Sequence, residues 1–265
     1  MKNILVPIGT SKNSAKTLQY AIDFAETFSS NVFVMQAYSV MSKAGTIANV
    51  NEIMERTSTE RLEEVIAAVD RKNTNVKIVT YKGDVVDGIK AVDGELGIDL
   101  IILSPKSNDI REEVYLGNTS GRIIKKTNIP ALIVPEDSVF GPYKSILTAF
   151  KSGIVKKESK LRVLQQIKDK YNSAVNLLLV KTPEYTEEDM VINGALMDLS
   201  ANVAITENAT TFQGVLQHFE SHQPDLLCVF RRKRGFFTKL WEKNIILKRE
   251  FFCSIPVLVL SVKKY

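Results

Sequence analysis

The chain has 265 residues, with 35 lysines and arginines against 30 aspartates and glutamates, and 45% of its residues are hydrophobic. This composition is typical of a globular protein and excludes a disordered, collagenous or fibrous chain. No apolar run approaches the ~20 residues that span a bilayer, and the N-terminal apolar stretch is too short for a signal peptide, so a cytoplasmic protein with no membrane association is expected.

The charge is divided unevenly along the chain. Residues 1–140 contain 16 basic and 18 acidic side chains, whereas residues 141–265 contain 19 and 12. Such a difference indicates two units with different surfaces. The two cysteines, Cys228 and Cys253, lack the spacing of a zinc or redox motif and are predicted to be small buried hydrophobic residues.

Short apolar runs alternate with longer amphipathic ones in the first half of the chain. The runs are rich in β-branched side chains, which predicts strands that are buried on both faces of a parallel sheet. They fall at residues 3–8, 32–36, 76–80, 100–103 and 131–134. Apolar residues at three- and four-residue spacing predict helices at residues 14–28 and 52–69.

The second half repeats this pattern. The first strand has a counterpart 142 residues later, and the segments that begin at Asp99 and Asn128 have counterparts 126 residues later, so the second copy lacks about 16 residues in its middle. Helices are predicted at residues 157–171, 186–199 and 210–222. This alternation predicts right-handed crossovers and an α/β fold with two tandem, doubly wound parallel-sheet domains, residues 1–138 and a shortened, degenerate copy at residues 143–265.

Several features of both halves resemble the universal stress protein family. In the first half they are an opening strand ending in Val-Pro, a Gly83-Asp84-Val85 turn, an Asp-Leu-Ile-Ile strand and a closing Asn-Ile-Pro-Ala-Leu-Ile-Val. The resemblance implies five-stranded Rossmann-like sheets, similar to the adenine nucleotide alpha hydrolase fold, with a nucleotide site at the carboxyl ends of the strands. It also implies that the last strands of the two halves pair, which would make the chain an intramolecular pseudo-dimer.

Nucleotide-binding members of that family resemble one another in a loop of the form G-x2-G-x9-G-[S/T] and in an acidic residue after the first strand. Glycines there let backbone N–H groups approach phosphate oxygens at a helix N-terminus. Here the spacing is kept, but serines replace the first two glycines, Asn118 stands at the Ser/Thr position, and Gly9 stands at the acidic one. The resemblance implies that a site for ATP or AMP would use Gly9, Ser104, Lys106, Ser107, Gly117, Asn118 and Thr119.

The second half departs further from the motif. Lys151 stands at the acidic position, and the loop contains Arg-Arg-Lys-Arg at residues 231–234 in place of glycines. No nucleotide site is therefore expected there. Eight basic residues lie between Arg231 and Arg249 among large aromatic residues, a pattern that fits either a solvated helix face or a docking site for an acidic or phosphate-rich partner.

No catalytic or metal site is predicted. His218 and His222 lie four residues apart on a predicted helix, but no third ligand accompanies them. No nucleophile, base and acid can be placed together, because both histidines belong to one helix.

The most economical interpretation is a non-catalytic stress-response or regulatory protein that binds an adenine nucleotide or another anion in its first domain. Two alternatives remain open. One is a weak ATPase or phosphoryl-transfer enzyme built on the same pocket. The other is an interaction module that uses the basic loop of the second domain to hold a protein partner. Further homodimerisation is compatible with each of these.

Overall fold

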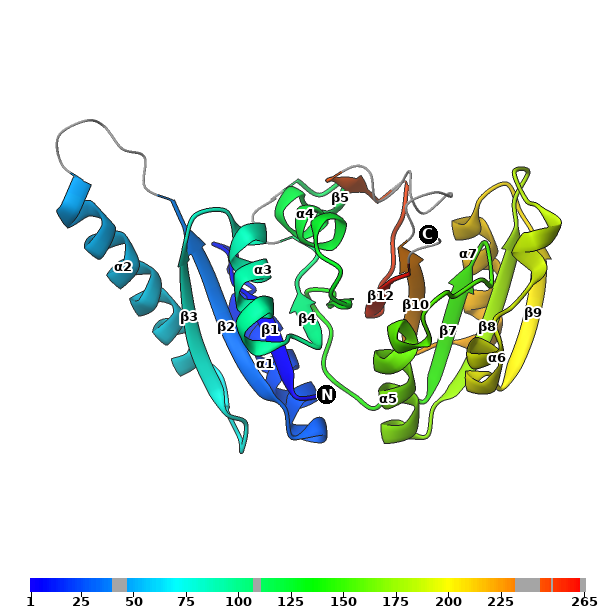
Figure 1. The fold of residues 1–265 in the computed structure, drawn as a ribbon, viewed down its shortest axis with the longest axis horizontal. Coiled ribbons are helices and arrows are strands. Elements are labelled where there is room, and N and C mark those ends of the chain that lie inside the picture. The colour runs from blue at the N-terminus through cyan, green and yellow to red at the C-terminus, as the bar shows by residue number, and fades with distance from the viewer. Residues whose placement is uncertain (40–46, 107–110, 232–243, 249, 263–265) are drawn as a thin grey trace.

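The computed structural model describes residues 1–39, 47–106, 111–231, 244–248 and 250–262 (Figure 1). Ten strands form one sheet in the order β3-β2-β1-β4-β6-β12-β10-β7-β8-β9. All neighbours in this sheet are parallel except β6 and β12, which meet at its centre and run antiparallel. The predicted α/β fold class is confirmed.

The first half contributes one side of the sheet and four helices. Its sheet strands are β1 (Asn3–Pro7), β2 (Asn31–Tyr38), β3 (Val76–Lys82), β4 (Leu100–Leu103) and β6 (Ala131–Ile133). Its helices are α1 (Ser14–Phe28), α2 (Ile47–Ala67), α3 (Val85–Leu96) and α4 (Asn118–Lys126). The apolar spacing in the sequence predicted the bounds of α1 at residues 14–28. The helix ends at Phe28, and Ser29 adopts a left-handed conformation at φ 52°.

The second half has the same strand order, with a much shorter connection between its second and third strands. Its sheet strands are β7 (Ser145–Phe150), β8 (Ala174–Lys181), β9 (Asn202–Glu207), β10 (Leu226–Arg231) and β12 (Val257–Ser261). The helices are α5 (Arg162–Tyr171), α6 (Gly194–Leu199) and α7 (Thr211–His222), with 3-10 turns η1 (Glu158–Leu161) and η2 (Glu187–Met190). Between β11 (Ile246–Leu247) and β12, the described residues contain no counterpart of α4.

The predicted helix at residues 186–199 is broken in two. Thr186 and Asp189 form a capping box that closes the η2 turn, and the Asn193 side chain accepts a hydrogen bond from the Ala195 N–H to start α6 separately. Only 20 residues connect β8 to β9, whereas 37 residues connect β2 to β3. The residues that the second half lacks therefore correspond to most of α2, which is 21 residues long against six in α6.

The helices cover both faces of the sheet. One hydrophobic layer packs α1, α2, α5 and α6 against the strands and runs through both halves, and the other packs α3, α4 and α7 against the opposite face. The central strands are apolar on both faces, as expected for parallel strands beneath two helical layers. Cys228 and Cys253 are free thiols buried in these layers, which confirms their predicted environment.

The halves meet through backbone pairing and an aromatic cluster. Strand β6 pairs with β12, with Leu132 opposite Leu258, and the short strand β5 (Val114–Leu116) pairs with β11. Rings from α1, the connecting segment and α5 pack together, and the hydroxyls of Tyr20 and Tyr143 lie 2.6 Å apart. Burial raises the pKa of both tyrosines, so both hydroxyls stay protonated.

The strand registers of the two halves correspond. In the first half, Ile4 of β1 lies opposite Leu100 of β4, and in the second half Ile146 of β7 lies opposite Leu226 of β10. These pairs match the sequence offsets of 142 and 126 residues. Positions in the two halves can therefore be compared residue by residue along these strands.

Candidate functional site

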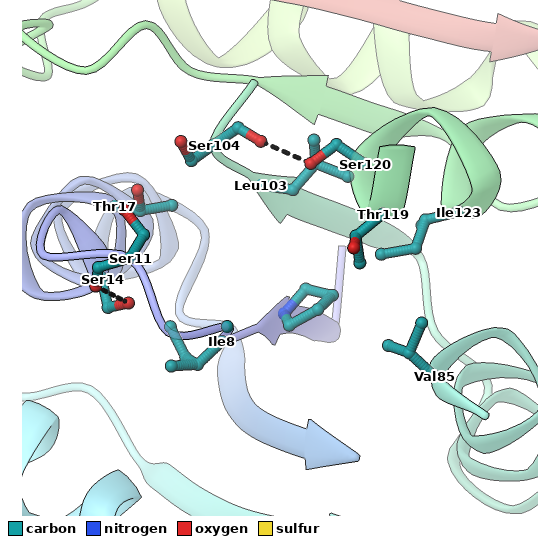
Figure 2. A pocket seen from close by; sticks show the side chains of 12 residues that line it. Ile8, Ser11, Ser14, Thr17, Val85, Leu103, Ser104, Thr119, Ser120 and Ile123 are labelled. Carbon is teal, nitrogen blue, oxygen red and sulfur yellow. Dashed lines mark hydrogen bonds between the residues drawn. The ribbon is translucent and has the colours of Figure 1, made fainter. Parts of the chain in front are cut away.

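A pocket opens in the first half at the carboxyl ends of β1 and β4 (Figure 2). The sheet order reverses between these two strands, and that reversal is where open α/β sheets hold their ligands. The enclosed cavity has a volume of about 40 Å³, and the space that atoms leave empty reaches about 460 Å³ when the open mouth is included. It is lined by Pro7, Ile8, Gly9, Ser11, Ser14, Thr17, Val85, Leu103, Ser104, Thr119, Ser120 and Ile123.

The first turn of α4 forms one wall of this pocket. The helix follows Gly117, which has no side chain to accept hydrogen bonds from the first-turn N–H groups. The Gly117 N–H donates to the Pro105 carbonyl at 2.9 Å, and the Ser120 hydroxyl donates to the Ser104 carbonyl at 2.8 Å. These two bonds fasten the helix start to the end of β4 and direct the positive end of the helix dipole at the pocket.

Hydroxyl groups surround the cavity from three sides. Figure 2 shows Ser11, before α1, and Ser14 and Thr17, in the first turn of α1, on one side of the pocket, with Ser104 and Thr119 on the other sides. The lining residues that the structure describes carry no charge. The Ser14 hydroxyl donates to the Ser11 carbonyl at 2.7 Å and the Thr17 hydroxyl to the Asn13 carbonyl at 3.2 Å, so these two oxygens face the pocket as acceptors. The site therefore offers as donors the N–H groups at the start of α4 and the hydroxyls of Ser11, Ser104 and Thr119, and its described lining contains no carboxylate that would repel an anion.

The structure brings together three of the seven residues predicted for the site. Gly9, Ser104 and Thr119 line the pocket, while Gly117 caps α4 behind it and Asn118 is exposed.

The remaining two predicted residues do not contribute to the described lining. Lys106 lines a different cavity, at the joint between the halves, and its ammonium donates to the Arg111 carbonyl at 3.0 Å. Ser107 lies outside the described residues. The sequence motif did not point to Ser11, Ser14 or Thr17, although hydroxyl residues directly after the first strand were the available signal.

An ion pair holds α3 to α4 beside the pocket. The Asp84 carboxylate accepts from the Arg122 guanidinium at 2.5 Å and from the Val86 N–H at 2.9 Å, so it also caps α3. The Arg122 bond, opposed by partial burial, lowers the pKa of Asp84 below its usual 3.8. The charge of Arg122 is thus already balanced within the first half.

The equivalent place in the second half is filled. Four residues beyond the paired positions of the strands, Phe150 and Phe230 stand where the first half has Ile8 and Ser104. The two rings stack at 5.7 Å with 14° between their planes, and each is 2% exposed or less. Two aromatic rings therefore occupy the space that remains open in the first half.

The short β8–β9 connection covers the carboxyl end of β7 in the second half. A Cβ added to Gly153 would lie 2.5 Å from the Ile192 backbone, so this segment rests directly on the β7–α5 loop. The Asn193 N–H donates to the Gly153 carbonyl at 3.0 Å, and the Asn193 side chain donates to the Val155 carbonyl at 3.0 Å. Because the connection is short, it lies against the β7–α5 loop, and the corresponding site of the second half is closed and not widened.

The other features considered from the sequence are a metal site, the histidines of α7, the basic run and a membrane span. Among the described residues no group of three or more His, Cys, Asp or Glu side chains could hold a metal ion. The His218 ring nitrogen lies 3.0 Å from the Gly214 carbonyl one helical turn earlier. Residues 232–243, with most of the basic run, are not described. In the described part of the chain, no helix is both long and apolar enough to cross a membrane.

Comparison with known proteins agrees with this fold. The model of the universal stress protein family matches residues 1–135, and the chain therefore belongs to that family. A universal stress protein from Archaeoglobus fulgidus DSM 4304 has a similar structure, with a TM-score of 0.74 at 17% identity over 98% of both chains. A protein of unknown function from Pseudomonas aeruginosa PAO1 gives 0.56 at 13% identity, over 99% of this chain and 93% of that one. A search of curated proteins found no match to the sequence.

Proposed function

We propose that this chain is a non-catalytic regulatory protein of the stress response whose first half binds a phosphate-bearing ligand. The ligand is an adenine nucleotide such as ATP or AMP, or a simpler anion, held in the pocket between β1 and β4. The observation that carries this proposal is the open, hydroxyl-lined pocket at the N-terminus of α4. Helix N-termini favour anions because their first N–H groups lack partners within the helix.

The composition of the lining favours binding over bond cleavage. Phosphoryl transfer needs a group that positions the nucleophile, together with cationic or metal stabilisation of the transferred phosphate. Gly9 stands where related nucleotide sites are expected to have an acid, and the nearby Asp84 carboxylate is engaged by Arg122 and the Val86 N–H. We therefore assign the pocket to recognition, with ATPase activity as the alternative that an assay would reveal.

We also propose that residues 1–138 and 143–265 are two copies of one domain that have divided their roles. The equal strand orders and corresponding registers support this proposal. The first copy keeps a pocket, whereas the second contributes a closed domain that completes the central sheet. The intramolecular pseudo-dimer would then replace a partner that a single-domain protein must recruit.

Calorimetric titration with ATP, AMP and inorganic phosphate tests the first-half site. We expect at least one of them to bind, and Ser104→Phe to weaken that binding at least tenfold, because it places in the first half the ring that fills the second. Ile205→Phe is the matched control, since it adds a ring at a half-exposed position of β9 and leaves the pocket unchanged.

Each outcome of the titration decides between the candidates. Absence of binding at millimolar concentration would reject the proposal, and equal weakening by both variants would place the ligand elsewhere. Phosphate release from ATP that is lost in Ser104→Phe would favour the enzyme.

A further inference from the structure

Arg231, at the end of β10 in the second half, holds the C-terminus of α4 in the first half. Its guanidinium donates to the Lys125 carbonyl at 3.0 Å, to the Thr127 carbonyl at 2.7 Å and to the Ser261 hydroxyl at 2.5 Å. The last carbonyls of a helix have no partner within it, and a cation there complements the helix dipole. Partial burial lowers the pKa of Arg231, which nevertheless remains charged.

A second contact from the same half reaches the middle of α4. A Cβ added to Gly121 would lie 1.9 Å from the Asn244 carbonyl oxygen, so only a glycine lets the two backbones approach this closely. Asn244 stands two residues before β11, which pairs with β5 at the start of the α4 segment. The second half thus touches α4 at its middle and again at its last turn.

The opposite side of α4 faces the pocket. Thr119, Ser120 and Ile123 line the pocket. Thr119 and Ile123 are each two residues from Gly121, and residues two apart in an α-helix point to nearly opposite sides. A helix of nine residues is too short to be stable by itself, so its position depends on the elements packed around it. Within so short a helix, a shift at one end moves the N–H groups at the other.

We propose that the second half positions α4 and thereby sets the ligand affinity of the first-half pocket, with Arg231 and the Asn244 backbone as the positioning groups. This inference rests on the proposed function. It assigns a role to the closed half, which acts on the pocket without contacting the ligand. The first basic residue of the Arg-Arg-Lys-Arg run is thus an internal contact and does not belong to a docking surface.

A matched pair of interface variants tests the inference. Arg231→Met removes the bonds to α4, whereas Arg162→Met removes the Arg162–Asp99 ion pair, a contact of 2.5 Å between the same halves near the amino ends of the strands. Two readouts apply to both proteins: hydrogen exchange of the α4 amides without ligand, and titration with ATP, AMP and inorganic phosphate. Arg231→Lys is a further variant that keeps the charge and loses the planar fork.

We expect Arg231→Met to speed exchange of the α4 amides several-fold and to weaken binding roughly three- to tenfold, the range of modest coupling between sites. Arg162→Met should change neither readout, and Arg231→Lys should fall between the two. Unchanged α4 exchange in Arg231→Met would overturn the inference, as would faster exchange with unchanged affinity. If no probe binds the wild-type protein, the proposed function fails, while the exchange experiment still decides whether the second half holds α4.

Discussion

The ends of β1 and β4 and the ends of β7 and β10 share one topology but have opposite interiors. In the first half, Ile8 and Ser104 leave a cavity open, whereas in the second half Phe150 and Phe230 stack in the corresponding places. Strand order and register are the same in both. The fold therefore supplies a place for a ligand, and a few side chains at the strand ends decide whether that place exists.

The two halves also differ in what covers these strand ends. The 37-residue connection between β2 and β3 contributes no residue to the described lining of the pocket, whereas the 20-residue connection between β8 and β9 places Ile192 against Gly153. The first half has α4 at its site, and the second half uses Arg231 to hold that same helix. The comparison indicates that the closed half serves the stability and geometry of the open one.

The largest expected effect comes from removing one of the two stacked rings in the second half. Phe150→Ala removes a ring that is 1% exposed and should lower the free energy of unfolding by about 3–5 kcal/mol. Ile8→Ala, at the equivalent position, should cost about 2 kcal/mol, at the low end of such substitutions, because Ile8 already borders empty space. Urea denaturation of both variants measures the difference, and equal losses would contradict the assignment of an open and a closed half.

An intermediate effect is expected where the second half presses on α4. Gly121→Ala should destabilise the protein by about 1–3 kcal/mol, because the new methyl group overlaps the Asn244 carbonyl. Gly94→Ala in α3 is the matched control: its Cβ meets nothing within 4 Å, so alanine should stabilise that helix by up to about 1 kcal/mol. Thermal unfolding should therefore shift in opposite directions, and parallel shifts would argue against the close contact.

The smallest effect concerns the clamp between α3 and α4. Asp84→Ala removes a helix cap and a partly exposed ion pair, and it should cost about 1 kcal/mol at neutral pH. Because folding lowers the pKa of Asp84 below 3.8, this stabilisation is present above that value and is lost as pH falls through the folded pKa. The difference between wild type and variant in urea denaturation should be seen at pH 7 and shrink by pH 3.

Asp87→Ala is the control for this clamp. Asp87 lies in the same first turn of α3, where it pairs with the exposed Lys90 at 3.6 Å. Its loss should cost less than that of Asp84 at neutral pH. Equal losses would show that the bond between Asp84 and Arg122 adds nothing to the first half.

The sequence was sufficient for most of the fold because local periodicity and burial follow the same pattern in both halves. The bounds of α1 and the positions of the sheet strands in the first half could be predicted from apolar spacing. The short strands β5 and β11 could not, since two or three residues carry no periodic signal and form only by pairing across the joint. The apolar pattern predicted one continuous helix at residues 186–199. It did not reveal the break between η2 and α6, where side-chain caps end one helical turn and start the next helix.

The candidate site was predictable only in part. The resemblance to the family motif implied that Gly9, Ser104 and Thr119 belong to one site, and they do meet where the carboxyl ends of neighbouring parallel strands lie. The motif did not reveal that Lys106 points toward the joint between the halves, or that Arg231 acts on α4 more than 100 residues earlier. The sequence by itself determined the repeated α/β framework, since that depends on local patterns of apolar residues. Tertiary structure alone decided which half keeps an open pocket and which residues hold α4, because both depend on contacts between segments far apart in the chain.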